Sequence, residues 1–171
     1  MIRMMVGLMV LASLRLWALD IGALPPKVIL HGDSGGTVEG KAWDTSQLRG
    51  KVHIVFYVDP DERSANDALT QALKKERFDA QRFASTVVIN LAATWMPNVV
   101  LESLLKKKQK EFPRTRYVKD KQKVLVRRWG LRDDAFDVLL FGRDGTLLYS
   151  KSGRLSDREI AQLIALIKKH L

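Results

Sequence analysis

The feature that most limits the folds open to this chain is a seven-residue run, Val52–Val58 (VHIVFYV), built almost wholly from β-branched and aromatic residues. Polar residues do not alternate with apolar ones in it, and Asp59-Pro60-Asp61 follows as a turn. Strands of this kind are buried on both faces, which is typical of the centre of a helix-covered parallel or mixed sheet. A second run, Thr86–Leu91 (TVVINL), has the same character. The two runs predict buried strands of an α/β fold.

Helical spacing follows each of these strands. Ser64 is predicted to cap a first helix, whose apolar face consists of Ala65, Ala68, Leu69, Ala72 and Leu73. A longer helix is predicted to begin at Pro97 and to end before Pro113. The remaining predicted elements are a strand at Arg116–Val118, a turn at Asp120–Lys123, a helical turn at Val124–Trp129, strands at Val138–Phe141 and Thr146–Tyr149 joined through Arg143-Asp144-Gly145, and a last helix that starts with the capping box Ser156-Asp157-Arg158-Glu159.

The order of these elements predicts the fold class. Val28–Leu30 is closed by turn residues at His31–Gly36 and the chain resumes at Thr37–Glu39, which predicts an N-terminal β-hairpin extension. Strands that alternate with helices and end in an antiparallel hairpin predict an α/β domain with a mixed β-sheet and helices on both faces. Because the chain shows no repeat or long linker, one domain over residues 22–171 is expected.

The first eighteen residues have the pattern of an export signal. Arg3 precedes an apolar stretch, Met4–Leu14, and Leu16-Trp17-Ala18 offers a cleavage point after Ala18. The apolar stretch is short for a membrane span, and Arg15 and Leu16 are unusual next to a cleavage site. We therefore expect residues 1–18 to be a signal peptide and the protein to be periplasmic. The alternative is an uncleaved segment that tethers the domain to the periplasmic face of the inner membrane.

The chain of 171 residues contains no cysteine. This excludes disulfides, thiolate metal sites, iron–sulfur clusters and cysteine nucleophiles. Histidine offers no replacement as a metal ligand, because His31, His53 and His170 are far apart and His53 lies inside an apolar strand. The glycines of the first hairpin do not lead into a helix, so they form no phosphate loop. We expect neither a metal nor a cofactor.

Four stretches, in this order and at these separations, resemble the peroxiredoxin and thiol-oxidoreductase branch of the thioredoxin-like superfamily. They are Leu48-Arg49-Gly50-Lys51 before the central strand, Val124–Leu131 before the final hairpin, Arg143-Asp144-Gly145 within it, and the closing helix. The resemblance implies a thioredoxin-like mixed sheet with helices on both faces.

The same resemblance implies where a redox site would lie. Enzymes of that branch carry a Cys-x-x-Cys pair after the central strand, and at this place the present chain has Glu62-Arg63-Ser64-Ala65. They also carry a cis-proline before the hairpin strand, and at that place the chain has Asp133–Asp137, a stretch that includes Ala135 and Phe136. Both landmarks are missing, so these residues are expected to be a vestigial active-site region. Because it lacks both landmarks, the chain resembles the YtfJ family of cysteine-less, thioredoxin-like periplasmic proteins. Ala93-Thr94-Trp95-Met96-Pro97 imitates a thioredoxin motif but follows the wrong strand, and we expect a loop with Trp95 and Met96 partly packed.

Positive charge is concentrated in one segment. The formal net charge is +10, and residues 106–132 hold twelve basic residues against Glu111 and Asp120. Residues 19–171 hold 27 basic and 19 acidic residues, a net charge of +8. Because residues 106–132 alone have a net charge of +10, the other residues of 19–171 have a net charge of −2. Such asymmetry favours docking to an anionic envelope component or an acidic protein, although charged runs are often plain solvated surface. The basic residues are Lys106, Lys107, Lys108, Lys110, Arg114, Arg116, Lys119, Lys121, Lys123, Arg127, Arg128 and Arg132.

Three functions stay open at this point. The first is a non-catalytic binding or adaptor domain that docks an anionic envelope partner, a membrane surface among them, through the basic segment. The second is a non-redox periplasmic enzyme that uses Asp59, Asp61 and Glu62 at the end of the central strand, although such carboxylates also stabilise a turn and a helix start. The third is a nucleic-acid-binding regulator, which the export signal disfavours.

Overall fold

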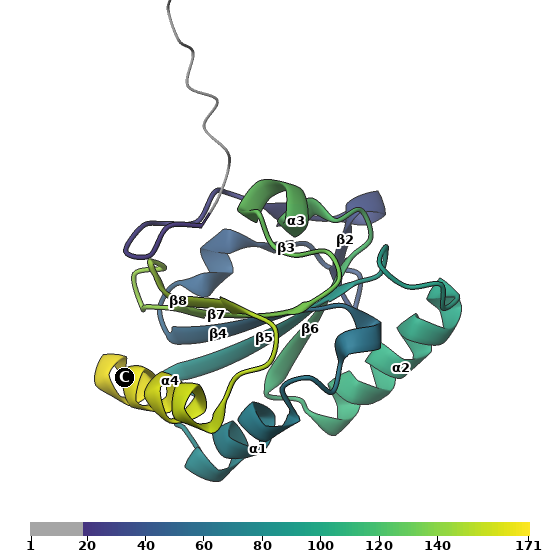
Figure 1. The fold of residues 1–171 in the computed structure, drawn as a ribbon. Helices are drawn as coiled ribbons and strands as arrows, with labels where there is room; N and C mark the ends of the chain where they lie inside the picture. The colour runs from purple at the N-terminus through teal and green to yellow at the C-terminus, as the bar shows by residue number, and fades with distance from the viewer. Residues whose placement is uncertain (1–18) are drawn as a thin grey trace, which may run out of the picture.

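The apolar run predicted to form the centre of the sheet is strand β4 (Val52–Val58), and all seven of its residues are buried. The computed structural model describes residues 19–171 (Figure 1), so the predicted signal segment 1–18 lies outside the described residues. A six-stranded sheet has the order β2-β6-β5-β4-β7-β8. Its other strands are β2 (Gly35–Thr37), β5 (Phe83–Asn90), β6 (Thr115–Asp120), β7 (Phe136–Phe141) and β8 (Leu147–Ser152).

The sheet is mixed, as predicted. Strands β4, β5 and β6 are parallel neighbours, whereas β7, β8 and β2 each run antiparallel to the strand beside them. Two successive parallel connections through helices place those helices on the same side of the sheet. The helices are α1 (Asp67–Glu76), α2 (Asn98–Glu111), α3 (Val124–Trp129) and α4 (Asp157–His170).

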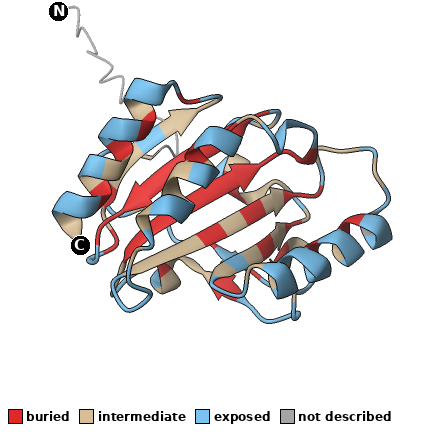
Figure 2. Ribbon diagram, turned by 90° about the horizontal axis from the view of Figure 1, so that it is seen from below, coloured by how far each residue is buried: buried red, intermediate tan, exposed pale blue. Residues whose placement is uncertain are grey.

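Two cores lie on opposite faces of the sheet. On the face that we call the closed face, α3 and the short strands β1 (Ile29–Leu30) and β3 (Trp43–Asp44) cover Val55, Tyr57 and Val88 with large side chains such as Trp43 and Trp129. On the other, the helical face, α1 and α4 pack on the alternate residues of β4 and β7. Helix α2 also lies on the helical face, beyond β5, and buries Leu101 and Leu105 in a smaller cluster with Leu91. Figure 2 views the molecule from this face.

The capping box and the final hairpin are confirmed. Ser156 and Glu159 form the reciprocal cap of α4, in which the Ser156 N–H donates to Glu159 Oε2 at 2.8 Å. Asp144 Oδ1 accepts a hydrogen bond from the Thr146 N–H at 3.0 Å and closes the turn between β7 and β8. These features depend on neighbouring residues only, which is why the sequence predicts them.

The predicted pairing of the N-terminal hairpin is wrong. Residues 32–34 do form a turn, but the two segments that flank it do not pair with each other. Strand β1 pairs with β3, and β2 joins the main sheet beside β6. Gly35, with φ 135°, allows this approach, because a Cβ there would lie 1.9 Å from the carbonyl oxygen of Lys119. The glycines that look like part of a turn are strand residues that fit closely against β6.

The predicted cap of the first helix is also wrong. Helix α1 begins at Asp67 after Asn66, and Ser64 lies in the preceding turn. Asn66 is buried and bridges two elements, since its Nδ2 donates to the carbonyl of Gly153 at 3.1 Å and its Oδ1 accepts from the Leu155 N–H at 2.9 Å. This long-range bridge, which local sequence does not reveal, fixes where the helix starts.

Candidate functional site

The end of the central strand, just before residues 62–65, lies against Ala135 and Phe136, the other part of the expected vestigial active-site region. The Asp59 N–H donates to the carbonyl of Ala135 at 3.0 Å, and the rings of Phe56 and Phe136 meet edge to face at 5.5 Å. Ala135 and Phe136 are buried, while Glu62, Arg63 and Ser64 are exposed and Ala65 is half-buried. Within residues 19–171, no histidine is hydrogen-bonded to Ser64. The region therefore presents no activated nucleophile there.

The carboxylates of the proposed enzyme alternative are not gathered into a site. Asp59 is buried and its Oδ1 accepts the Asp61 N–H at 2.9 Å, so it caps the short helix Pro60–Glu62. Asp61 and Glu62 are exposed. Among residues 19–171, no group of three His, Cys, Asp or Glu side chains is placed to hold a metal ion. This geometry matches the structural role of capping.

A buried polar cluster at the carboxyl ends of the parallel strands was missed by the sequence reasoning. Asp120 accepts hydrogen bonds from the N–H groups of Val124 and Leu125, both at 2.9 Å, and from the Tyr57 hydroxyl at 3.2 Å. Burial, reinforced by the Asp120 charge, raises the pKa of Tyr57. The signal was Asp120 itself, an aspartate four residues before a helical pattern. Its contacts fix the start of α3 and leave its carboxylate engaged.

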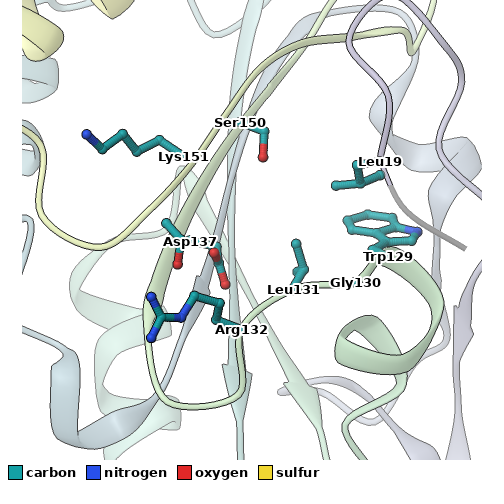
Figure 3. A pocket seen from close by; sticks show the side chains of 9 residues that line it. Leu19, Trp129, Gly130, Leu131, Arg132, Asp137, Ser150 and Lys151 are labelled. Atoms are coloured by element: carbon teal, nitrogen blue, oxygen red, sulfur yellow. The ribbon is translucent and has the colours of Figure 1, made fainter. Parts of the chain in front are cut away.

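A second missed residue is Asp137, which lines a pocket of about 230 Å³ with Trp129, Leu131 and Arg132 (Figure 3). Asp137 is 4% exposed, and its Oδ2 has no hydrogen-bond partner within the described residues. Burial raises the pKa of this carboxyl group. The amine of Lys151 points away from the pocket in Figure 3 and pairs with Glu159. Asp137 thus lies in the stretch where the related enzymes carry their proline, and Arg132, Ser150 and Ser152 line the same pocket.

The basic segment does not form one continuous patch. Its residues lie on α2, β6 and the turn after it, and also on α3, which covers the opposite face of the sheet. Acidic residues just outside the segment pair with several of them: Glu102 with Lys119 at 3.3 Å and Lys121 at 3.7 Å, Asp133 with Lys123 at 2.6 Å, and Asp134 with Arg132 at 3.9 Å. The hydrogen bond from Lys119 lowers the pKa of Glu102. The local excess of charge is therefore smaller in space than in sequence.

The three aromatic residues inside the segment, Phe112, Tyr117 and Trp129, do not present open ring faces for bases to stack on. Trp129 is buried, and Tyr117 is half-buried under α2. The ring of Phe112 is already covered, with Lys74 Nζ at 4.7 Å and Lys108 Nζ at 5.0 Å from its centroid. Binding of single-stranded nucleic acid usually requires open aromatic faces.

A large hollow lies between α1 and α2. This α1–α2 groove has a volume of about 1690 Å³ and continues around the amino end of β5. Its floor is the helical face of β5, where Ser85, Val87 and Ile89 stay half-buried because the helices on either side cover them only in part. Leu101, Leu104 and Leu105 of α2 form one wall, and the other side consists of Leu73 of α1 and Phe78 just after it.

The charged residues that line the groove are mostly basic. Ten lysines and arginines stand against three acidic residues, and several of the ten lie far from residues 106–132 in sequence. The acidic residues are Glu39, Asp67 and Glu111, and the basic residues are Lys41, Arg49, Lys51, Arg63, Lys74, Arg77, Lys107, Lys108, Arg114 and Arg116. The sequence window thus found four of the ten and missed six that the fold brings to the same groove.

Two arginines of the groove are held in place. Arg114 Nη2 donates to the carbonyl of Phe78 at 2.6 Å, and Arg116 Nη1 donates to Gln47 Oε1. These contacts use a fraction of the five N–H groups on each guanidinium. The remaining groups are suited to anionic oxygen atoms, which guanidinium binds in a bidentate manner.

The loop before α2 differs from the expectation. Met96 is half-buried against Leu101 and Leu105, as predicted, but Trp95 is 87% exposed. The prediction of a partly packed Trp95 is therefore wrong. Pro97 and Met96 determine the path of the loop, and this path turns the indole toward solvent.

Comparison with known proteins settles the family. Residues 30–170 match the family described as "Bacterial protein of unknown function (YtfJ_HI0045)". The chain belongs to the YtfJ family. Its relative YtfJ of Escherichia coli K12 is 25% identical over 134 residues, which are 77% of this chain and 73% of the relative. The family resemblance expected from the missing cysteines and proline is thereby confirmed.

Solved structures with low sequence identity show the same fold. A thiol peroxidase from Chromobacterium violaceum matches with a TM-score of 0.62 at 11% identity, over 89% of this chain and 88% of that one. An exposed lipoprotein thioredoxin from Streptococcus pneumoniae matches with a TM-score of 0.59 at 15% identity, over 84% and 98%. This member of the YtfJ family thus has a thioredoxin-like fold but, unlike proteins that use thiol chemistry, contains no cysteine.

Proposed function

We propose that this member of the YtfJ family is an exported, non-redox docking domain that binds an anionic envelope partner in the α1–α2 groove. One observation carries the proposal: the groove is lined by ten basic and three acidic residues. A concave surface of one charge sign concentrates field lines and attracts ligands of the opposite sign. The groove replaces the continuous basic segment as the docking site.

Export is part of the proposal. Residues 1–18 have the pattern of a signal peptide, and one of the similar structures is named as an exposed lipoprotein. Among the described residues, no helix is both long enough and apolar enough to pass through a bilayer. An envelope location favours phosphate-bearing or carboxylate-bearing envelope components as partners over nucleic acid.

A non-catalytic role is also part of the proposal. The chain lacks cysteine, and the position of the redox site holds exposed Glu62, Arg63 and Ser64 with no general base hydrogen-bonded to the serine among residues 19–171. Docking requires only the shape and charge of the groove.

Charge reversal in the groove tests the proposal. The double variant Lys74→Glu, Arg114→Glu changes one residue from each side of the groove, and we expect it to bind inorganic polyphosphate about tenfold or more weakly in titration calorimetry. Binding to the unaltered protein should also weaken as salt is raised, because exposed charges are screened.

The matched control is Arg158→Glu, Lys169→Glu, which makes the same change in net charge on the exposed surface of α4. This control should bind almost as well as the unaltered protein. Equal losses in both double variants would show that net charge alone is responsible and would contradict a docking site in the groove. Circular dichroism and a thermal melt establish that each variant is folded.

A further inference from the structure

A second exposed surface lies outside the groove, on the outward side of α2. Val99, Ser103, Lys106 and Lys110 are spaced as one stripe of the helix, and all four are exposed. Trp95 precedes the stripe and is 87% exposed, and Val99 is 80% exposed. Figure 1 shows α2 at the outer edge of the sheet, past β6. We call Trp95, Val99, Lys106 and Lys110 the α2 outer face.

The indole is held outward by its neighbours. Met96 packs against Leu101 and Leu105, and its N–H donates to Thr94 Oγ1 at 3.2 Å. Pro97 accepts hydrogen bonds at its carbonyl from the N–H groups of Val100 and Leu101. With Met96 and the first turn of α2 fixed in this way, Trp95 projects into solvent.

The lysines of the outer face form no ion pair within the described residues, although the charge of Lys106 helps to lower the pKa of Glu102. Helix α2 contains two carboxylates, and each is engaged elsewhere: Glu102 pairs with Lys119 and Lys121, and Glu111 pairs with Lys108. Among the ion pairs of residues 19–171, none includes Lys106 or Lys110. The outer face therefore combines exposed apolar side chains with unpaired positive charge.

We propose that the α2 outer face docks onto the surface of an anionic lipid bilayer, with Trp95 and Val99 in the interfacial layer and Lys106 and Lys110 on the headgroups. Tryptophan favours this layer because its ring is apolar with one polar edge. Lysine beside an apolar helix stripe is typical of interfacial helices, whereas lysine is depleted in protein–protein interfaces. The charge and composition of the face thus select a membrane over a protein partner.

This surface is separate from the site of the proposed function. Of the residues that line the groove, none belongs to the α2 outer face. Docking through the outer face would hold α2 against the bilayer and keep the groove beside it at the membrane surface. The two sites can therefore be altered independently.

Vesicle binding with tryptophan fluorescence tests the inference. Residues 19–171 contain the complete sheet and both cores, so this unit is used without residues 1–18, whose apolar run would itself bind lipid. Within this unit Trp43 and Trp129 are buried, so the exposed tryptophan is Trp95. Its emission should shift to shorter wavelength on adding phosphatidylglycerol-containing vesicles and should not shift with pure phosphatidylcholine.

Variants separate the contributions. Trp95→Phe should abolish the shift but keep co-sedimentation with vesicles, whereas the double variants Trp95→Ser, Val99→Ser and Lys106→Glu, Lys110→Glu should each weaken co-sedimentation about tenfold or more. Ile29→Ser, another exposed apolar residue, and Arg158→Glu, Lys169→Glu on α4 are the matched controls and should bind normally.

Three results would overturn the inference: no binding to anionic vesicles, equal binding to neutral vesicles, or unchanged binding in both outer-face double variants. The groove variant Lys74→Glu, Arg114→Glu should keep vesicle binding while losing polyphosphate. Loss of vesicle binding in that variant alone would move the membrane contact to the groove and reject the outer face, while leaving the proposed function standing.

Discussion

Strand β5 has two faces that differ in how completely the fold covers them. On the closed face its Thr86, Val88 and Asn90 have no exposed surface, whereas on the helical face its Val87 and Ile89 stay half-buried between α1 and α2. The closed face is sealed by α3 and the N-terminal strands, which supply Trp43 and Trp129. Both sets of side chains belong to one strand, so the difference in burial comes from the elements that pack on each face. Over β5, the closed face is therefore fully covered, whereas the part of the helical face between α1 and α2 is left available for binding.

The largest effect expected from this contrast is at Trp129. Its ring packs against Trp43 at 6.4 Å and Phe141 at 5.9 Å, and its Nε1 donates to the carbonyl of Pro26 at 2.9 Å. We expect Trp129→Ala to lower the free energy of unfolding by about 3–5 kcal/mol, because it leaves a large cavity in the closed face. Urea denaturation measures the change.

Trp95→Ala is the matched control for this prediction, because it removes the same side chain from an exposed loop. Its free energy of unfolding should stay within about 0.5 kcal/mol of the unaltered protein. A small loss for Trp129→Ala would mean that the closed face does not carry the stability we assign to it.

A smaller effect is expected from protonation of His53, also on the closed face. His53 is buried with Nε2 2.8 Å from Thr86 Oγ1, and burial lowers its pKa to about 4, helped by the charges of Arg116 and Lys51. An unfolded histidine has a pKa near 6.5, so the unfolded state takes up the proton first. The contribution of the neutral His53 ring to the free energy of unfolding is therefore fully present above about pH 6.5, and it is lost as the pH falls toward 4.

The loss over this range should reach at most about 3 kcal/mol. The measurement is the difference in unfolding free energy between the unaltered protein and His53→Gln, taken at several pH values so that shared carboxylate titration cancels. The stability advantage of the unaltered protein over His53→Gln should become smaller as the pH falls. Parallel stability curves for the two proteins would show that His53 does not titrate in this way.

The parts of the fold that the sequence predicted are those decided by local pattern. The uninterrupted run at Val52–Val58, the capping box at Ser156 and the turn at Asp144 each depend on adjacent residues, and each lies where it was expected. The errors occur where distant segments meet. Gly35 of β2 pairs with β6, which is far from it in sequence, and Asn66 is hydrogen-bonded to the loop before α4.

The candidate site was harder to predict than the fold for the same reason. Counting charge along residues 106–132 left out Glu102, which lies four residues earlier and neutralises two of the lysines in space. It also left out Lys74 of α1 and Arg77 just after this helix, which line the same groove as α2 only after folding. A one-dimensional window finds how much charge a segment carries, but the sheet decides which charges share a surface.

The smallest effect separates two neighbouring leucines of the groove wall on α2. Leu104 is 49% exposed on the groove wall, whereas Leu101, one turn earlier, is 5% exposed in the cluster with Leu91. We expect Leu104→Ser to change the free energy of unfolding by no more than about 0.5 kcal/mol, since little apolar surface is lost from the core. Leu101→Ala, as the reference, should lose about 2–5 kcal/mol. Thermal and urea unfolding of the two variants give the values. A large loss for Leu104→Ser would mean that Leu104 also belongs to the core, and the contrast between a closed face and an open one would then fail at the helix that borders the groove.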